Sequence, residues 1–103
     1  MPAYVVVDIE VKNPADYERY KALAPPSIAQ YGGKYLARSS STEVLEGSWK
    51  PKRFVIVEFP SMERVRAWWS SPEYAAAKTL RQGCTSTSMV AVEGTPPTPG
   101  SRT

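Results

Sequence analysis

The stretch "RFVIVEFPSMERVRAWW", residues 53–69, combines a strand pattern with a helix pattern. Its first seven residues are mostly β-branched or aromatic and alternate between two faces, as the side chains of a strand do. A proline ends the strand, and Ser61 is suited to cap the helix that follows. In this helix Met62, Val65 and Trp69 recur at helical spacing, which predicts a buried stripe. The stretch therefore predicts a strand that leads directly into an amphipathic helix.

The same strand-to-helix order opens the chain. "AYVVVDIEV", residues 3–11, is rich in β-branched residues and predicts a strand. Asn13 is a favourable N-cap, and Pro14 suits the first helical position. Pro25 and Pro26 lack the backbone N–H that a helix interior needs, so we expect this helix to be interrupted there. A second short helical piece should then end at the glycine pair that follows.

The remaining patterns complete a β-α-β-β-α-β order, with the second helix in two pieces. They predict a strand at 34–39, a polar arm at 40–52 with a turn between Gly47 and Pro51, a helix from Pro72 to about Gly83, and a strand at 86–94. This order is that of the ferredoxin-like α+β fold, a four-stranded antiparallel sheet with helices on one face. Residues 1–94 should form one domain, and the proline-rich residues 95–103 should form a disordered tail.

The predicted strands have one face under the helices and one open face. We expect the helix face to hold Val5, Val7, Ile9, Val55, Val57, Phe59, Val90 and Val92. We expect the open face to hold Tyr4, Val6, Phe54, Ile56, Met89 and Ala91, together with Asp8 and Glu58. A sheet face this apolar is unfavourable in water, which predicts a homodimer whose two sheets close into a barrel.

Composition excludes several classes of protein. The chain has no histidine, which removes Ser-His and Cys-His nucleophile pairs and histidine metal sites. Its one cysteine, Cys84, excludes an intrachain disulfide and suits packing better than redox chemistry. The net charge of +3 comes from dispersed cations, unlike the basic block of a nucleic-acid binder. No signal peptide or membrane span is recognisable, so we expect a cytoplasmic protein with no metal, cofactor, nucleic-acid or membrane partner.

Four motifs in combination resemble the domain of unknown function 1330 family. They are "YVVVDIEVKNPADYERY" (4–20), "YGGKYLAR" (31–38), "EVLEGSWKPKRFVIVEFPS" (43–61) and "WWSSPEYAAAKTLRQ" (68–82). The resemblance covers roughly residues 2–94 and departs from the family at "RQGCTSTSM" (81–89) and in the tail. It implies a member of the dimeric α+β barrel superfamily, which also contains antibiotic-biosynthesis monooxygenase-like proteins. It implies no particular reaction.

Two carboxylates are candidates for catalysis. Asp8 and Glu58 lie on strands that are neighbours in a ferredoxin-like sheet, and both should face the dimer side. In a partly desolvated place they would share a proton and act as acid and base. The alternative is that each pairs with an arginine across the dimer interface, for which Arg38 on the second strand is the natural partner.

Arg81 and several aromatic residues are candidates for ligand binding. Arg81 follows Tyr74 by seven residues and therefore shares the face that the last helix should bury. It either grips a carboxylate or phosphate, or stabilises the helix C-terminus and extends into water. Tyr35, Trp68 and Tyr74 either line a pocket or belong to the core. Trp49, in a polar turn beside cations, either covers the mouth of a cleft or packs across the dimer.

These patterns support two hypotheses of different classes. The first is a dimer that binds a small aromatic or carboxylate ligand between helices and sheet, with Arg38 and Arg81 as anchors. If it is an enzyme, a cofactor-independent oxygenase or an isomerase fits best, because histidine is absent. The second is a non-catalytic dimeric sensor or accessory module. A pocket holding an unpaired acid would favour the first, and a closed core with both acids paired to arginines would favour the second.

Overall fold

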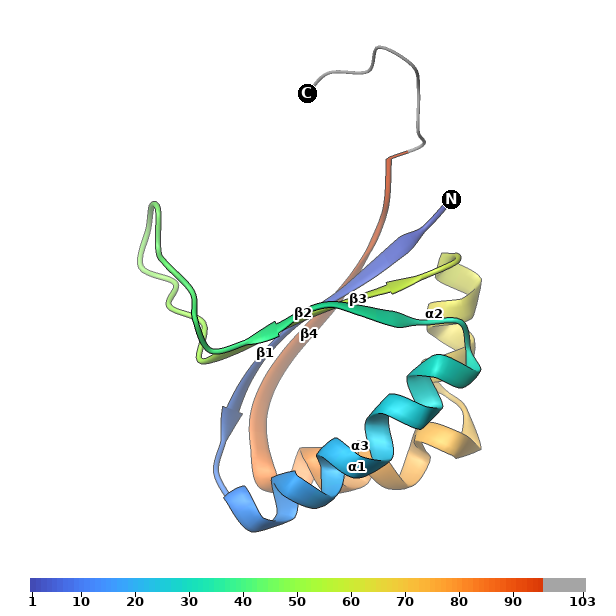
Figure 1. The fold of residues 1–103 in the computed structure, drawn as a ribbon, viewed down its shortest axis with the longest axis horizontal. Helices are drawn as coiled ribbons and strands as arrows, with labels where there is room; N and C mark the ends of the chain where they lie inside the picture. Colours follow the sequence, from blue (N-terminus) through green and yellow to red (C-terminus); the bar gives the residue numbers. More distant parts are fainter. Residues whose placement is uncertain (96–103) are drawn as a thin grey trace.

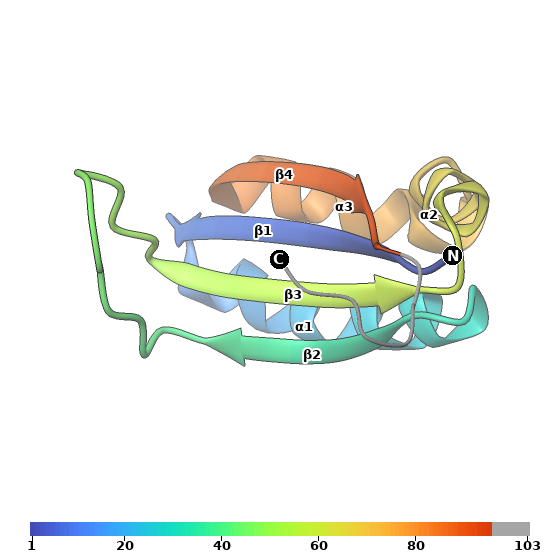
Figure 2. The same cartoon turned by 90° about the horizontal axis from the view of Figure 1, so that it is seen from above.

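A computed structural model describes residues 1–95. Its elements are β1 (Ala3–Val11), α1 (Pro14–Gln30), β2 (Lys34–Ser39), β3 (Arg53–Phe59), α2 (Met62–Trp69), α3 (Pro72–Cys84) and β4 (Thr85–Glu93). The strands form one antiparallel sheet in the order β2-β3-β1-β4, with β2 and β4 at its edges (Figure 2). All three helices cover the same face of the sheet (Figure 1). The ferredoxin-like α+β fold predicted from the sequence is confirmed.

Short polar side chains set where the helices begin. Asn13, Ser61 and Ser71 each accept a hydrogen bond from the backbone N–H three residues further on. Such caps satisfy one of the four backbone donors that the first turn of a helix leaves without partners. None of the helices within residues 1–95 has the length and apolar character that crossing a bilayer requires. The predicted tail lies, apart from Thr95, outside the described residues.

The predicted interruption of α1 is wrong, because the helix runs through Pro25 and Pro26 without a break. Two backbone hydrogen bonds are lost there, since neither proline has an N–H to donate. The carbonyls that lose their donors belong to Lys21 and Ala22, both exposed residues, so water can reach that side of the helix. On the buried side Ser27 donates its hydroxyl to the Ala24 carbonyl at 2.7 Å.

The assignment of β4 to its two faces is also wrong. Met89 lies opposite Val7, so it shares the helix face, whereas Val90 and Val92 are 64% and 51% exposed on the open face. Ala91 likewise lies on the helix face. Both alternating sets of β4 side chains are apolar, so periodicity alone does not say which set is buried. The pairing of β4 with β1 decides it.

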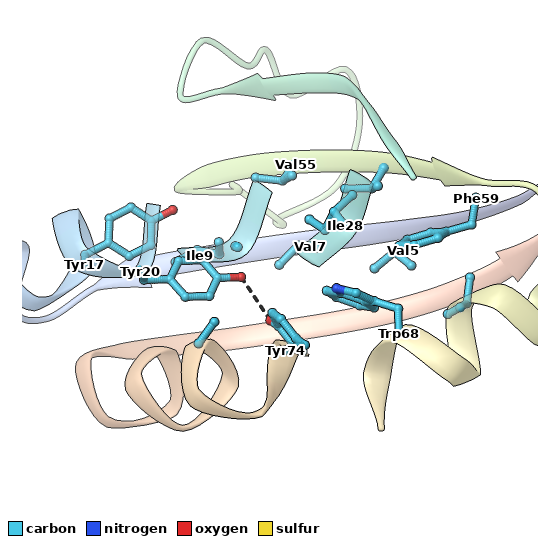
Figure 3. Close-up of a cluster of buried hydrophobic side chains, with 14 of the residues drawn as sticks. Val5, Val7, Ile9, Tyr17, Tyr20, Ile28, Val55, Phe59, Trp68 and Tyr74 are labelled. Atoms are coloured by element: carbon cyan, nitrogen blue, oxygen red, sulfur yellow. Dashed lines mark hydrogen bonds between the residues drawn. The ribbon is translucent and has the colours of Figure 1, made fainter. Parts of the chain in front are cut away.

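The core fills the space between the helices and the sheet (Figure 3). Trp68 is its central aromatic residue, with ring centroids 4.2 Å from Tyr74 and 5.3 Å from Phe59. In α2 the buried residues are Val65 and Trp68. The predicted stripe is therefore right at Val65, but Trp68 is buried in place of Trp69. Burial raises the pKa of the Cys84 thiol, which agrees with a packing role.

Candidate functional site

The structure does not bring all the predicted site residues together. Arg81 and Trp68 border a cleft beside β4, and Tyr74 lies directly behind Arg81. Tyr35 and Arg38 lie at a different place, between α1 and the β2–β3 side of the sheet. Trp49, Asp8 and Glu58 belong to the open side of the sheet, away from the helices. The single pocket expected from the sequence is therefore divided.

Asp8 anchors the connection between β2 and β3. Its carboxylate accepts a hydrogen bond from the Trp49 indole at 2.9 Å and another from the backbone N–H of Lys52 at 3.0 Å. The connection extends past the end of the sheet toward the face that the helices leave open (Figure 1). The Trp49 ring also packs edge-on against Phe54, 5.6 Å away. Trp49 thus holds the base of this arm and does not cover a cleft on the helix side.

Glu58 lies far from Asp8 along the ladder. Asp8 is opposite Phe54 and Glu58 is opposite Tyr4, which separates the two carboxylates by four residues, or about 13 Å. Within one subunit they cannot share a proton. Glu58 instead lies 3.9 Å from the ammonium group of Lys34. Within one subunit Glu58 does not pair with Arg38, which lies on the helix face of the sheet.

The β4 cleft has an apolar chamber of about 330 Å³ at the edge of the sheet. Its floor consists of Val5, Met89 and Ala91 from the helix face of β1 and β4. The side facing this floor is formed by α2 and the residue that follows it. These contribute Met62, Val65, Arg66, Trp68, Trp69 and Ser70. This lining suits the hydrocarbon or aromatic part of a small molecule.

A polar chamber of about 340 Å³ lies along the same edge and shares Trp69 and Met89 with the apolar one. Its remaining lining comes from the end of α3 and the start of β4: Arg81, Gln82, Thr85 and Thr87. The two threonine hydroxyls lie 2.7 Å apart, and Thr85 is also 2.7 Å from the Arg81 carbonyl. The cleft is therefore apolar at one end and polar at the other.

Arg81 is the most unusual residue of the cleft, because it is charged and only 4% exposed. Its Nε donates to the Tyr74 hydroxyl at 3.2 Å, and its guanidinium carbon lies 6.0 Å from the centre of the Trp69 ring. No carboxylate of residues 1–95 lies within 4.0 Å of its nitrogens. Arg81 does not extend into water, which answers one of the alternatives left open by the sequence.

The Tyr74 hydroxyl continues this network into the core. It lies 3.0 Å from the Tyr20 hydroxyl on α1, as the dashed line in Figure 3 shows. Burial raises the pKa of Tyr20 far above its ordinary value, and the neighbouring Tyr74 adds to that increase. Three polar groups in a row thus connect the polar chamber to the interior.

The buried Tyr20 predicts a loss of stability at alkaline pH. Its pKa is raised on folding, so above about pH 10 the unfolded chain releases a proton that the folded chain keeps. The contribution of Tyr20 to stability is fully present below that pH and falls by about 1.4 kcal/mol per pH unit above it. Urea unfolding between pH 9 and 11 should show a shallower decline in Tyr20→Phe. An unchanged slope in this variant would contradict the assignment.

Several residues of the cleft were absent from the sequence prediction. Trp69 was assigned to the core, yet it is 39% exposed and borders both chambers. The pairing of β4 with β1 is what identifies the other lining residues of the cleft. It starts β4 at Thr85 and places Thr85 and Thr87 on the helix face, next to Gln82 at the end of α3. The neighbouring tryptophans 68 and 69 were the available signal, since adjacent helical positions cannot both be buried on a narrow stripe.

Solved structures share this arrangement of sheet and helices. A protein of unknown function from Rhodopseudomonas palustris has a TM-score of 0.77 and 17% identity over 93% of this chain and 84% of its own. A dimeric ferredoxin-like protein of unknown function from Jannaschia sp. CCS1 has a TM-score of 0.73 and 12% identity, covering 91% and 100%. SnoaB, a cofactor-independent oxygenase from Streptomyces nogalater, has a TM-score of 0.66 and 15% identity, covering 95% and 97%. At these identities the likeness establishes the fold and not the activity.

The structure thus defines a small ferredoxin-like α+β domain with a cleft between the helices and the sheet edge. No curated protein sequence matches the chain significantly. The chain belongs to the family described as Domain of unknown function (DUF1330), whose model matches residues 2–95. The resemblance seen in its four motifs is thereby confirmed.

Proposed function

We propose that this protein binds a small organic acid in the β4 cleft. The observation that carries the proposal is Arg81, a buried arginine that borders the polar chamber without a carboxylate partner among residues 1–95. Burying a charge is costly unless an opposite charge or strong hydrogen bonds accompany it. The contacts that Arg81 does make are a neutral tyrosine and the face of an indole.

The shape of the cleft defines the class of ligand. A carboxylate at the Arg81 guanidinium would also lie near Thr87, whose hydroxyl would donate to it by turning away from Thr85; the Thr85 proton is already donated to the Arg81 carbonyl. An aromatic or branched aliphatic body would then extend past Trp69 over Met89 into the apolar chamber. Chambers of about 330 and 340 Å³ fall within the range of small-molecule sites, roughly 300–1,000 Å³.

Turnover of the ligand is an extension of this proposal. Cofactor-independent oxygenation or isomerisation agrees with a chain that lacks histidine and with the similar fold of SnoaB. Tyr74 is fully buried and lines neither chamber, so its hydroxyl supports Arg81 from behind and is not in contact with the ligand. Asp8 and Glu58 face the other side of the sheet, so the proposal gives them no part in binding. A non-catalytic sensor would use the same cleft without consuming its ligand.

We further propose that a second copy of the chain covers the open face of the sheet. Val90 and Val92 stand exposed there beside Val6 and Tyr4 of β1. A contiguous apolar face of this kind typically marks an interface. The structural relative from Jannaschia is itself described as dimeric.

Titrations with benzoate, salicylate and hexanoate, each compared with its uncharged amide, test the ligand proposal. Fluorescence of Trp69 or calorimetry should show that at least one acid binds and that its amide binds much more weakly. Arg81→Met should weaken binding of that acid roughly 10- to 100-fold, because a charge-assisted hydrogen bond is lost. Arg81→Lys should weaken binding less than Arg81→Met does, because lysine keeps the positive charge but lacks the planar fork of donors.

Arg19→Met is the matched control, because Arg19 is an exposed arginine of α1. It should leave the affinity unchanged. Equal binding by wild type and Arg81→Met, with both chains folded, would refute the proposal. Oxygen uptake and product analysis with the best ligand then separate an enzyme from a sensor.

A further inference from the structure

Arg53 directly follows the polar arm of residues 40–52 and has no role in the cleft described above. It is the first residue of β3 and lies opposite Ile9, so its side chain is on the helix face of the sheet. The hydrogen bond from Lys52 to Asp8 fixes the backbone immediately before it. The Nε atom of Arg53 is buried and has no hydrogen-bond partner among the described residues.

A second arginine reaches the same place from β2. A register shift between Tyr35 and Ala37 allows both Tyr35 and Arg38 to lie on the helix face, with Arg38 opposite Val55. Arg53 is two residues from Val55 on β3, so the two arginines are diagonal neighbours, about 7–8 Å apart at the backbone. Arg38 and Arg53 line one small cavity between α1 and the sheet.

Tyrosine rings orient both guanidinium groups. The Arg38 guanidinium carbon lies 4.2 Å from the centre of the Tyr35 ring, and that of Arg53 lies 5.9 Å from the centre of the Tyr17 ring. An arginine stacked on a ring uses its face and keeps its N–H edge for in-plane hydrogen bonds. Within the described part of the chain, no carboxylate lies within 4.0 Å of either guanidinium.

Other charged groups near this place do not neutralise it. Lys21 of α1 lies 5.9 Å from the Tyr17 ring centre and also lines the cavity. Its ammonium group is 3.0 Å from Glu18, so that ion pair is self-contained. Asp8 and Glu10 flank Ile9 in the sequence of β1. Asp8 is engaged by the arm on the opposite face, and Glu10 pairs with Lys12 at 3.2 Å. What remains is Arg53, whose buried Nε has no partner among the described residues, beside Arg38, whose guanidinium is exposed to solvent and lies over the Tyr35 ring.

We infer that Arg38 and Arg53 form a second anion site, separate from the β4 cleft, that takes a compact oxyanion such as a phosphate or carboxylate group. The cavity between them and the core is only about 30 Å³, which is the space of one water molecule. It has no room for an organic body or for a whole oxyanion. The anion therefore binds at the mouth of the cavity, against the exposed Arg38 and the terminal nitrogens of the partly exposed Arg53, while the buried Nε of Arg53 is not reached from there. The inner end of this cavity shares Val5, Trp68 and Met89 with the apolar chamber, but neither Arg38 nor Arg53 lines the β4 cleft.

The direct test is an NMR titration of the whole protein with inorganic phosphate and, separately, with acetate. The Nε–Hε signals of the arginines report on each guanidinium individually. The signals of Arg53 and Arg38 should shift and saturate together with one or both anions, and the stronger anion identifies the head group. Arg53→Met and Arg38→Met should each weaken binding by roughly tenfold or more.

Two control variants separate this site from the cleft. Arg19→Met removes an exposed arginine of the same helix layer, and Arg81→Met removes the cleft arginine; neither should change the affinity measured at Arg53. Shifts that rise linearly without saturating, or that are the same in Arg53→Met, would overturn the inference. Movement of the Arg81 signal alone would overturn it as well while leaving the proposed function intact. Saturation at Arg53 in a protein that binds none of benzoate, salicylate and hexanoate would support this inference and refute the proposed function.

Discussion

Replacing Trp68 with alanine should lower the free energy of unfolding by about 3–5 kcal/mol, the usual cost of emptying a tryptophan site in a core. Trp68 is 2% exposed and packs against Tyr74 and Phe59. Its indole N–H also donates to the Ser27 hydroxyl at 3.2 Å, and the loss of this bond would leave the buried Ser27 with one partner fewer. Since domains are stable by only about 5–15 kcal/mol, this one change removes a large share of the total. Urea unfolding measures it.

Trp69→Ala is the matched control for this prediction, because it deletes the same side chain one position further along α2. Trp69 is partly exposed, so its loss should cost far less stability than the loss of Trp68. It should nevertheless weaken binding in the cleft, since Trp69 borders both chambers. Equal destabilisation by the two variants would mean that the packing described for Trp68 is wrong.

The elements of the fold were predictable because their signals are local. The β-branched residues of 3–11 alone predict that strand, and Asn13 and Ser61 mark the starts of two helices as caps. The failure at Pro25–Pro26 has a physical cause of the same local kind. The carbonyls that the two prolines leave without donors belong to exposed residues, where water can satisfy them, and this lowers the cost of continuing α1 through the pair.

The site was less predictable because it depends on pairing between distant strands. Sequence placed Asp8 and Glu58 on neighbouring strands but gave no register, and the register separates them. Arg81 was found because its spacing from Tyr74 on one helix is fixed by helix geometry. Thr85 and Thr87 could not be found in this way, since their place in the cleft follows from how β4 pairs with β1.

A glutamate at position 90 should dissociate the proposed dimer without unfolding the chain. Val90 is 64% exposed and lies opposite Val6, on the face that the second copy would cover. A two-fold interface would bring the new charge in duplicate into an apolar contact, at a cost of about 3–5 kcal/mol. The dimer dissociation constant should then rise roughly 100- to 1,000-fold or more. Light scattering should give twice the chain mass of 11.4 kDa for the wild type and the single mass for Val90→Glu.

The neighbouring residue supplies the comparison that makes this test decisive. Met89 lies on the helix face opposite Val7, where it borders the cleft and packs against the core. Met89→Glu should therefore lower the melting temperature strongly, because it places an unpaired carboxylate among apolar side chains. Val90→Glu should lower the melting temperature far less than Met89→Glu does, because the new side chain of Val90→Glu points into solvent in the separated subunit. If Val90→Glu unfolded the chain and Met89→Glu did not, the register of β4 would be wrong. If the wild type were a monomer, the open face would need another partner.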